Sequence, residues 1–165
     1  MNVSFAITLA FVATLSTLTI SIVCEATADW AHSTIDSSST GLWQFCFQKR
    51  CVFYSEIASV AAYIQAVRAF SVMSIILQGG AIFALLYACL DSKCHFRTSS
   101  IFLLCAGFLM LVAMSIFTGK YERDTGVVFG YSFILGWIST TACFLVSCCL
   151  CVVKRDDYSY SPDNS

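Results

Sequence analysis

Charge and proline are both scarce in this sequence. Asp, Glu, Lys and Arg make up only 12% of its 165 residues, about half the share found in water-soluble domains. The formal net charge of −1 gives no indication of a nucleic-acid partner. The single proline, Pro162, lies close to the C-terminal end, so no long apolar segment carries a proline kink. The shortage of charge excludes an ordinary soluble domain and favours a membrane protein.

Apolar residues, by contrast, make up 58% of the chain and gather in four long runs. Each run is long enough for a helix that crosses a bilayer, which needs roughly 20 residues. No charged residue lies at the centre of any run, which argues against a pump or a proton-coupled transporter. We predict one membrane domain over 1–153, followed by a disordered cytosolic tail over 154–165. Its spans are expected at about 3–24, 69–90, 99–118 and 127–153, with a first outer loop at 26–68.

The first apolar run also has features of a cleavable signal peptide, because Ala26-Thr27-Ala28 imitates a small-residue cleavage site. Two features favour a retained span instead. The apolar stretch is too long for a signal peptide, and no positive charge precedes it. We expect this run to remain in the membrane.

A hairpin is predicted in the second half of the first loop. Aromatic and β-branched residues mark strands at Leu42–Phe47 and Cys51–Tyr54. A two-residue turn at 48–49 would place Cys46 opposite Cys51 with Cα atoms about 4.5 Å apart, within reach of a disulfide. The two turn residues are not a favoured turn pair, so a looser turn remains an alternative.

Cysteine chemistry decides the predicted orientation. The Lys and Arg residues are divided almost evenly between the two sides, so the positive-inside rule does not decide. Cys46 and Cys51 can pair only in an oxidising space, which places the first loop outside the cell. Because the number of spans is even, both termini of this plasma-membrane protein would then lie in the cytosol.

Four cysteines near the cytosolic ends of the spans are candidate acylation sites. Thiols stay reduced in the cytosol, and those close to a membrane and beside basic residues can carry acyl chains. Metal binding is the alternative, but the cytosolic cysteines lack paired C-x-x-C spacing with partners. The four cysteines are Cys94, Cys148, Cys149 and Cys151.

Neither a cofactor site nor a catalytic site is predicted. His32 and His95 fall on opposite sides of the membrane, so they cannot share a metal ion. The sequence does not place a nucleophile, a base and an orienting acid together on one side. We expect neither an enzyme nor a small-molecule substrate.

Small residues at four-residue spacing predict close packing between helices. Such stripes let helix backbones approach each other in lipid, where packing replaces the hydrophobic effect. Chance is the alternative explanation, because alanine-rich segments produce the same spacing. Gln78 is expected to form a hydrogen bond between helices rather than to bind a substrate. The stripes are Ala6, Ala10 and Thr14; Gly80, Ala84 and Ala88; and Ser132, Gly136 and Thr140.

A recognisable motif combines a tryptophan, a Gly-Leu-Trp triplet and a close cysteine pair, with two further stretches at the starts of the second and fourth spans. These residues are Trp30, Gly41-Leu42-Trp43, Cys46, Cys51, Gln65–Phe70 and Gly130–Trp137. Together they resemble the claudin, peripheral myelin protein and epithelial membrane protein superfamily. The gap of four residues between the cysteines is shorter than in typical tight-junction claudins. It is more similar to the lens fibre membrane intrinsic protein and small claudin-domain-containing branch.

The resemblance implies a membrane all-α fold: a four-helix transmembrane bundle under a small extracellular antiparallel β-sheet formed by the outer loops. It places Trp30, Leu42 and Trp43 at the membrane boundary. Arg68 would lie beneath them as a cation–π partner of one tryptophan. Interfacial anchoring by the aromatic residues alone is the other interpretation.

We hypothesise a non-enzymatic protein that mediates cell–cell contact or organises a junctional membrane through its extracellular sheet. Its partners would be membrane lipid and further copies of itself, in cis or in trans. The expected contacts are the hairpin tip and the second outer loop, although both groups also fit simple solvated loop tips. These residues are Gln48, Lys49, Arg50, Lys120, Glu122, Arg123 and Asp124.

An auxiliary subunit of an ion channel or receptor is the second hypothesis, as in other branches of the superfamily. Its spans would pack on a partner through a small-residue stripe such as the one at 80–88. A paracellular pore or barrier ranks lower, because the first loop offers few charges to line a pore, namely Asp36, Lys49 and Arg50.

Overall fold

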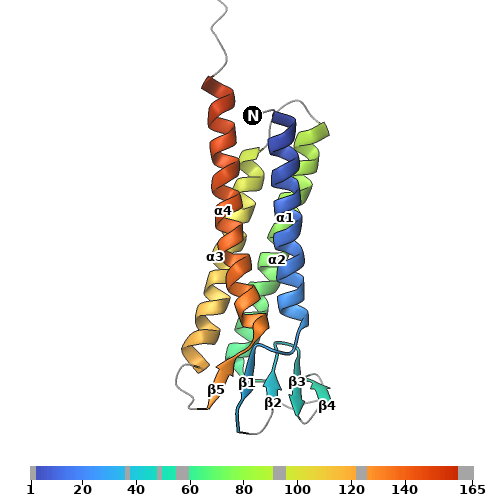
Figure 1. Ribbon diagram of the computed structural model, residues 1–165, viewed down its shortest axis with the longest axis vertical. Coiled ribbons are helices and arrows are strands. Elements are labelled where there is room, and N and C mark those ends of the chain that lie inside the picture. Colours follow the sequence, from blue (N-terminus) through green and yellow to red (C-terminus); the bar gives the residue numbers. More distant parts are fainter. Residues whose placement is uncertain are drawn as a thin grey trace, which may run out of the picture.

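The computed structural model describes residues 3–35, 38–47, 50–54, 60–90, 96–121 and 126–159. Four long helices run side by side, and a small sheet covers one end of the bundle (Figure 1). The helices are α1 (Val3–Ala26), α2 (Ala62–Leu90), α3 (Phe96–Tyr121) and α4 (Tyr131–Ser159). Within the described ranges, four helices are long and apolar enough to cross a membrane, which confirms the predicted bundle.

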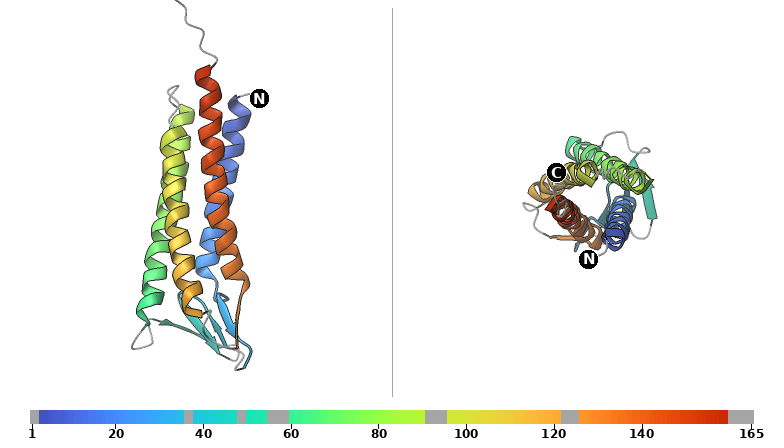
Figure 2. Two further views of the ribbon diagram at one scale, coloured as in Figure 1. Left: turned by 90° about the vertical axis from the view of Figure 1, so that its left-hand side faces the viewer. Right: turned by 90° about the horizontal axis from the view of Figure 1, so that it is seen from above.

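The helices pack in chain order around a ring. α1 contacts α2, α2 contacts α3, α3 contacts α4, and α4 closes the ring on α1. Figure 2 shows this arrangement from above. The start of α1 and the end of α4 lie at the same end of the bundle, opposite the sheet (Figure 1).

Five short strands form one antiparallel sheet in the order β4-β3-β2-β1-β5. Four of them come from the first loop, and the fifth directly precedes α4. A small antiparallel sheet from the outer loops was predicted, and it is confirmed. The strands are β1 (Ala31–Ser33), β2 (Ser38–Thr40), β3 (Gln44–Phe47), β4 (Arg50–Phe53) and β5 (Val127–Phe129).

The helix of the second span begins before the predicted start of the span itself. α2 starts at Ala62 rather than at residue 69. The sequence prediction stopped at Arg68 because a charge interrupts the apolar run. The helix continues through Arg68 because the Arg68 side chain finds partners in the loop residues that flank the sheet strands.

The fourth apolar run divides into a strand and a helix. Residues 127–129 form β5, and α4 begins at Tyr131 rather than at residue 127. Two valines and a phenylalanine favour a strand, and β5 pairs with β1.

The far end of α4 also departs from the prediction. α4 is helical as far as Ser159, past residue 154, where the sequence predicts that the tail begins. A long helix extends readily because each added residue forms one more backbone hydrogen bond. Residues 160–165 lie outside the described part of the chain.

The buried apolar side chains form two clusters. The cluster at the sheet end includes the fully buried Trp30, Leu42 and Phe117. The cluster toward the opposite end includes the fully buried Leu85 and Leu103. The larger side chains of the first cluster therefore connect the sheet to the bundle.

A buried polar group joins three helices between these clusters. The Gln78 side-chain amide on α2 donates to the Ser21 hydroxyl on α1 at 2.9 Å. The Ser21 hydroxyl lies 2.5 Å from the Ser139 hydroxyl on α4. The predicted hydrogen bond between helices at Gln78 is thus present.

Two of the predicted small-residue stripes pack inside the bundle. A Cβ atom added at Gly136 would lie 2.6 Å from the Met114 sulfur on α3, so the flexible Met114 side chain would have to shift to make room for it. A Cβ atom at Gly80 would meet the Phe102 ring of α3 at 3.8 Å, and Ala88 is buried. Ser132 and Thr140 of the stripe on α4 are also buried, and so is Thr14 of the third predicted stripe, on α1.

Candidate contact surface

Trp30 anchors the start of the sheet inside the bundle. Its side chain is fully buried, and its indole N–H donates to the Cys24 carbonyl at 2.8 Å. Its ring packs edge-on against Phe117, with 5.0 Å between centroids. Trp30 is therefore a packed core residue, and interfacial anchoring in lipid does not describe it.

The Gly-Leu pair of the motif brings the sheet close to α1 and α2. A Cβ atom at Gly41 would lie 2.5 Å from the Ala28 Cα, so the chains approach at a distance that only glycine permits. Leu42 is fully buried, and its carbonyl accepts a hydrogen bond of 2.6 Å from the Arg68 Nε–H. These contacts place the β3–β4 hairpin against the start of α2.

Arg68 lies between two aromatic rings that flank this hairpin. Its guanidinium carbon is 4.9 Å from the centroid of the Trp43 ring and 5.0 Å from that of Tyr54. Both distances are within the range of cation–π interactions. The cation–π geometry expected for one tryptophan is therefore found at Trp43, and Tyr54 adds a second ring that the sequence did not indicate.

Glu25 completes this group, and the sequence analysis assigned it no role. It is 6% exposed, and the Trp43 indole N–H donates to its carboxylate at 3.1 Å. Its carboxylate also interacts electrostatically with Arg68. Because Glu25 is buried whereas Arg68 is half-buried, removing Arg68 would leave a buried carboxyl group without its neighbouring positive charge. The signal that could have revealed Glu25 is a lone carboxylate at the end of the first apolar run.

A shallow hollow of about 240 Å³ opens beside this group. Burial of the Tyr54 hydroxyl raises its pKa, and the neighbouring Tyr63 adds to that effect, so Tyr54 stays neutral at physiological pH. The hollow therefore combines aromatic walls with one permanent positive charge. It is lined by Trp43, Phe53, Tyr54, Val60 and Arg68.

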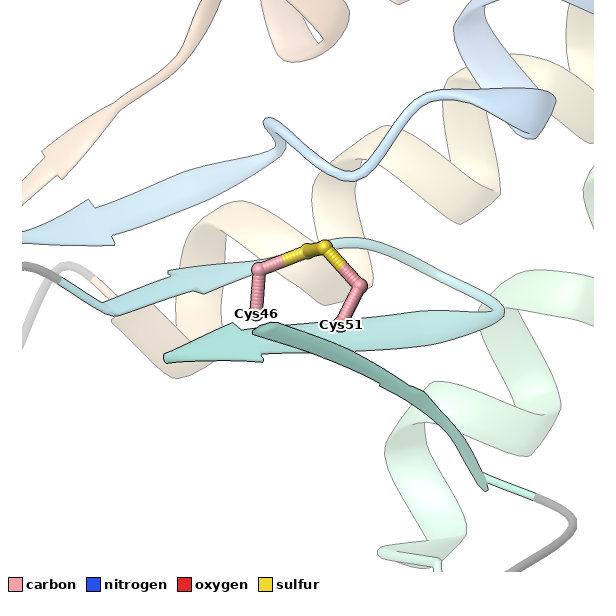
Figure 3. Close-up of a disulfide and its surroundings, with 2 residues drawn as sticks. All are labelled: Cys46 and Cys51. Carbon is pink, nitrogen blue, oxygen red and sulfur yellow. A yellow bond between two sulfur atoms is a disulfide. The ribbon is translucent and has the colours of Figure 1, made fainter. Parts of the chain in front are cut away.

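The predicted disulfide links β3 and β4 (Figure 3). Cys46 pairs with Cys51 in the strand register, with Cα atoms 4.0 Å apart, and Phe47 pairs with Arg50. This confirms the predicted register. Residues 48 and 49, where the turn was placed, lie outside the described ranges.

The outer side of β4 is an open edge. In the sheet order, β4 is the terminal strand, and all four of its residues are exposed. The Tyr54 N–H donates to the Trp43 carbonyl at 3.1 Å, which sets the alternation of hydrogen-bonded pairs along the hairpin. By that alternation, the backbone groups of Cys51 and Phe53 point away from β3 and toward the open edge.

Apolar side chains accompany this edge. Phe53 is 56% exposed, Phe47 46% and Val52 39%. Exposed apolar groups beside a strand edge are typical of surfaces that pair with another chain. We call β4 together with Phe47 the β4 edge.

The predicted charged contacts are only partly covered by the structure. Arg50 is exposed on β4, and Lys120 is exposed near the end of α3. The Lys120 ammonium lies 5.8 Å from the Tyr63 ring centroid on α2. The remaining predicted contacts, Gln48, Lys49, Glu122, Arg123 and Asp124, lie outside the described residues.

Metal ligands do not gather in the described part of the chain. Among those residues, no three or more His, Cys, Asp or Glu side chains lie close enough together to hold a metal ion. His32 instead lies 3.5 Å from the Asp29 carboxylate, and His95 falls outside the described ranges.

Comparison with known proteins places this arrangement in one family. The model of the PMP-22/EMP/MP20/Claudin family matches residues 3–150. Human epithelial membrane protein 1 is 28% identical over 149 residues, covering 88% of this chain and 94% of the relative. Bovine lens fiber membrane intrinsic protein is 28% identical over 135 residues, covering 74% of this chain and 76% of the relative. With its four spans, its motif tryptophans and its cysteine pair, the chain belongs to the PMP-22/EMP/MP20/Claudin family of membrane proteins.

Proposed function

We propose that this protein is a non-enzymatic plasma-membrane protein whose sheet mediates cell–cell contact or organises a junctional membrane. The observation that carries the proposal is the β4 edge, an open strand with exposed apolar side chains beyond the ends of the spans. Contact through a strand edge combines backbone hydrogen bonds with side-chain packing.

The proposed orientation puts the sheet outside the cell and both termini in the cytosol. The Cys46–Cys51 disulfide supports it, because such a bond persists in an oxidising compartment. An impermeant thiol reagent applied to intact cells tests the orientation. After reduction it should label Cys46 and Cys51 but none of the α4 cysteines at the opposite end of the bundle. Labelling of α4 cysteines on intact cells would reverse the orientation.

A rigid attachment makes the sheet suited to contact. Trp30, Arg68 and Leu42 fix the sheet on the bundle through buried contacts, so little conformational freedom is lost when a partner binds. β4 and β5 are opposite edges of the sheet, and the second outer loop immediately precedes β5.

Cell aggregation provides the test. Non-adherent cells that express the protein should aggregate, and the double variant Phe47→Thr with Phe53→Thr should lose most of that activity. Phe108 lies on α3 with 62% of its side chain exposed, and Phe108→Leu is the matched control. Cells that express this control should aggregate normally. Unchanged aggregation by the double variant, at equal surface delivery, would rule out the β4 edge as the contact.

A second candidate function is an auxiliary subunit of a channel or receptor. In the stripe first considered for this role, Gly80 faces the Phe102 ring of α3 and Ala88 is buried in the core of the bundle. The structure offers Gly79 instead, where an added Cβ atom would meet nothing within 4 Å. A partner helix could approach α2 closely there. Gly79→Leu should then abolish co-purification of a channel or receptor subunit in mild detergent, while delivery of the protein to the cell surface remains normal. Unchanged co-purification would exclude this contact.

A further inference from the structure

The hollow beside the β3–β4 hairpin lies at the level where the hydrocarbon of a bilayer ends. The candidate span Ala62–Ala88 has 27 residues and is roughly 40 Å long, whereas the hydrocarbon layer is about 30 Å thick. Counted back from Ala88, the roughly 20 residues that cross the hydrocarbon stop directly after Arg68. Arg68 and the hollow that it lines therefore lie at the depth of the lipid head groups.

Two further side chains mark the same depth. Lys120 ends the candidate span on α3, and its ammonium lies 5.8 Å from the ring centroid of Tyr63, in the first turn of α2. Aromatic and basic side chains gather at this level because each has an apolar body and a polar tip. A molecule in the hollow is therefore within reach of lipid as well as of water.

The Arg68 guanidinium is only partly used by the protein. Its Nε–H donates to the Leu42 carbonyl, but its buried Nη2 has no hydrogen-bond partner within the described part of the chain. The Glu25 carboxylate does not supply one. It accepts from the Trp43 indole through Oε2, and among the described residues its buried Oε1 likewise has no partner. An unpaired charged donor is costly in a buried position, so an anion is a favourable neighbour for this guanidinium.

The walls of the hollow suit the remainder of a head group. Phe53 and Trp43 are exposed and apolar, and the Tyr54 hydroxyl, whose pKa is raised by burial, keeps its proton to donate at physiological pH. Of the five described residues that line the hollow, none is acidic. The volume of about 240 Å³ is below the roughly 300–1,000 Å³ of pockets that enclose a whole small molecule. The hollow therefore fits one end of a larger molecule.

We propose that this hollow binds the phosphate group of a phospholipid from the leaflet on the sheet side of the membrane. The Arg68 guanidinium and the Tyr54 hydroxyl donate to the phosphate oxygens. The glycerol end of the lipid packs on Phe53, Trp43 and Val60. A guanidinium presents five N–H donors in one plane, so it holds a phosphate while its Nε–H stays on a carbonyl. Both leaflets contain phospholipid, so the proposal does not depend on which compartment the sheet faces.

Native mass spectrometry of the full-length protein in detergent tests the proposal. The protein is stripped of lipid and titrated with dioleoyl phosphatidylcholine, and then with dioleoylglycerol, which lacks the phosphate. Wild type should bind one phosphatidylcholine at least about tenfold more tightly than it binds dioleoylglycerol. Tyr54→Phe keeps the ring but removes the hydroxyl, so its affinity for phosphatidylcholine should fall about tenfold. Equal affinity of wild type for the two lipids would overturn the proposal.

A matched pair of valine variants locates the site. Val60→Trp fills the hollow and should abolish the tight binding. Val128→Trp places the same side chain at an exposed position of β5, on the opposite edge of the sheet, and should bind like wild type. Unchanged binding by Val60→Trp, or an equal loss in both variants, would overturn the proposal. If Val60→Trp does not fold, Tyr54→Phe is compared with Tyr131→Phe at the exposed start of α4, and equal binding by these two variants would also overturn it.

Inorganic phosphate distinguishes a lipid site from a site for a free anion. Phosphatidylcholine should raise the melting temperature of wild type but not that of Val60→Trp, because a ligand that binds only the folded state stabilises it. Inorganic phosphate at millimolar concentration should leave both melting temperatures unchanged. A rise with inorganic phosphate as large as the rise with lipid would assign the hollow to a free anion and overturn the lipid proposal.

Discussion

The junction between the sheet and the bundle is held by aromatic rings and an arginine, whereas hydrogen-bonded polar side chains join the helices in the middle of the bundle. At the junction, Trp30 and Phe117 are fully buried and Arg68 lies between two rings. In the middle, Ser21 and Gln78 join two helices through hydrogen bonds of 3.2 and 2.9 Å.

The difference follows from the surroundings of each region. The junction borders water, so burying aromatic surface is favourable there. The middle of the bundle lies where lipid replaces water, and apolar burial gains little against lipid tails. Close packing and hydrogen bonds therefore hold the helices together. The junction fixes the orientation of the sheet, and the bundle supports the sheet through many individually weak contacts between helices.

The largest effect is expected from Arg68→Gln, which removes the positive charge that interacts with Glu25. The free energy of unfolding should fall by about 3 kcal/mol, because the Leu42 carbonyl loses its charged donor and the rings of Trp43 and Tyr54 lose their cation. Surface delivery and thermal stability in detergent measure the effect. Arg68→Lys keeps the charge but loses the planar group over Trp43, so it should be intermediate. Wild-type stability of Arg68→Gln would show that the junction does not depend on this charge.

A smaller loss is expected from Gly41→Ala at the same junction. The added methyl group would collide with the Ala28 backbone, at a cost of about 1–3 kcal/mol. Gly79→Ala is the matched control, because its methyl group meets nothing within 4 Å. Alanine also has a higher helix propensity than glycine, so the control should leave stability unchanged or raise it by up to about 1 kcal/mol. Equal thermal shifts for the two variants would contradict the close approach at Gly41.

The smallest effect is expected in the middle of the bundle, from Gln78→Leu. Hydrogen bonds between membrane helices contribute only about 0.6 kcal/mol each on average, so a loss of about 1 kcal/mol is expected. Gln65→Leu, at an exposed position of the same helix, is the control and should leave thermal stability unchanged. A loss at Gln78 as large as that of Arg68→Gln would show that the polar group, rather than the junction, dominates stability.

Predictions from local spacing were accurate where neighbouring residues alone decide the outcome. The hairpin register is one case, since Cys46 and Cys51 lie on adjacent strands and their pairing follows from turn length. The fourth span is a contrary case. Val127 to Phe129 continues an apolar run, and its strand is stabilised by pairing with β1, which lies far away in the sequence.

The sequence by itself determined the four spans, the hairpin with its disulfide and the family motif, because length, alternation and spacing are local properties of the chain. Only the tertiary structure decided that Trp30 is buried, that Glu25 joins Arg68 and Trp43, and that β5 completes the sheet. These features arise from segments that meet after the helices pack. Their partners cannot be identified from the spacing of residues along a single strand or helix.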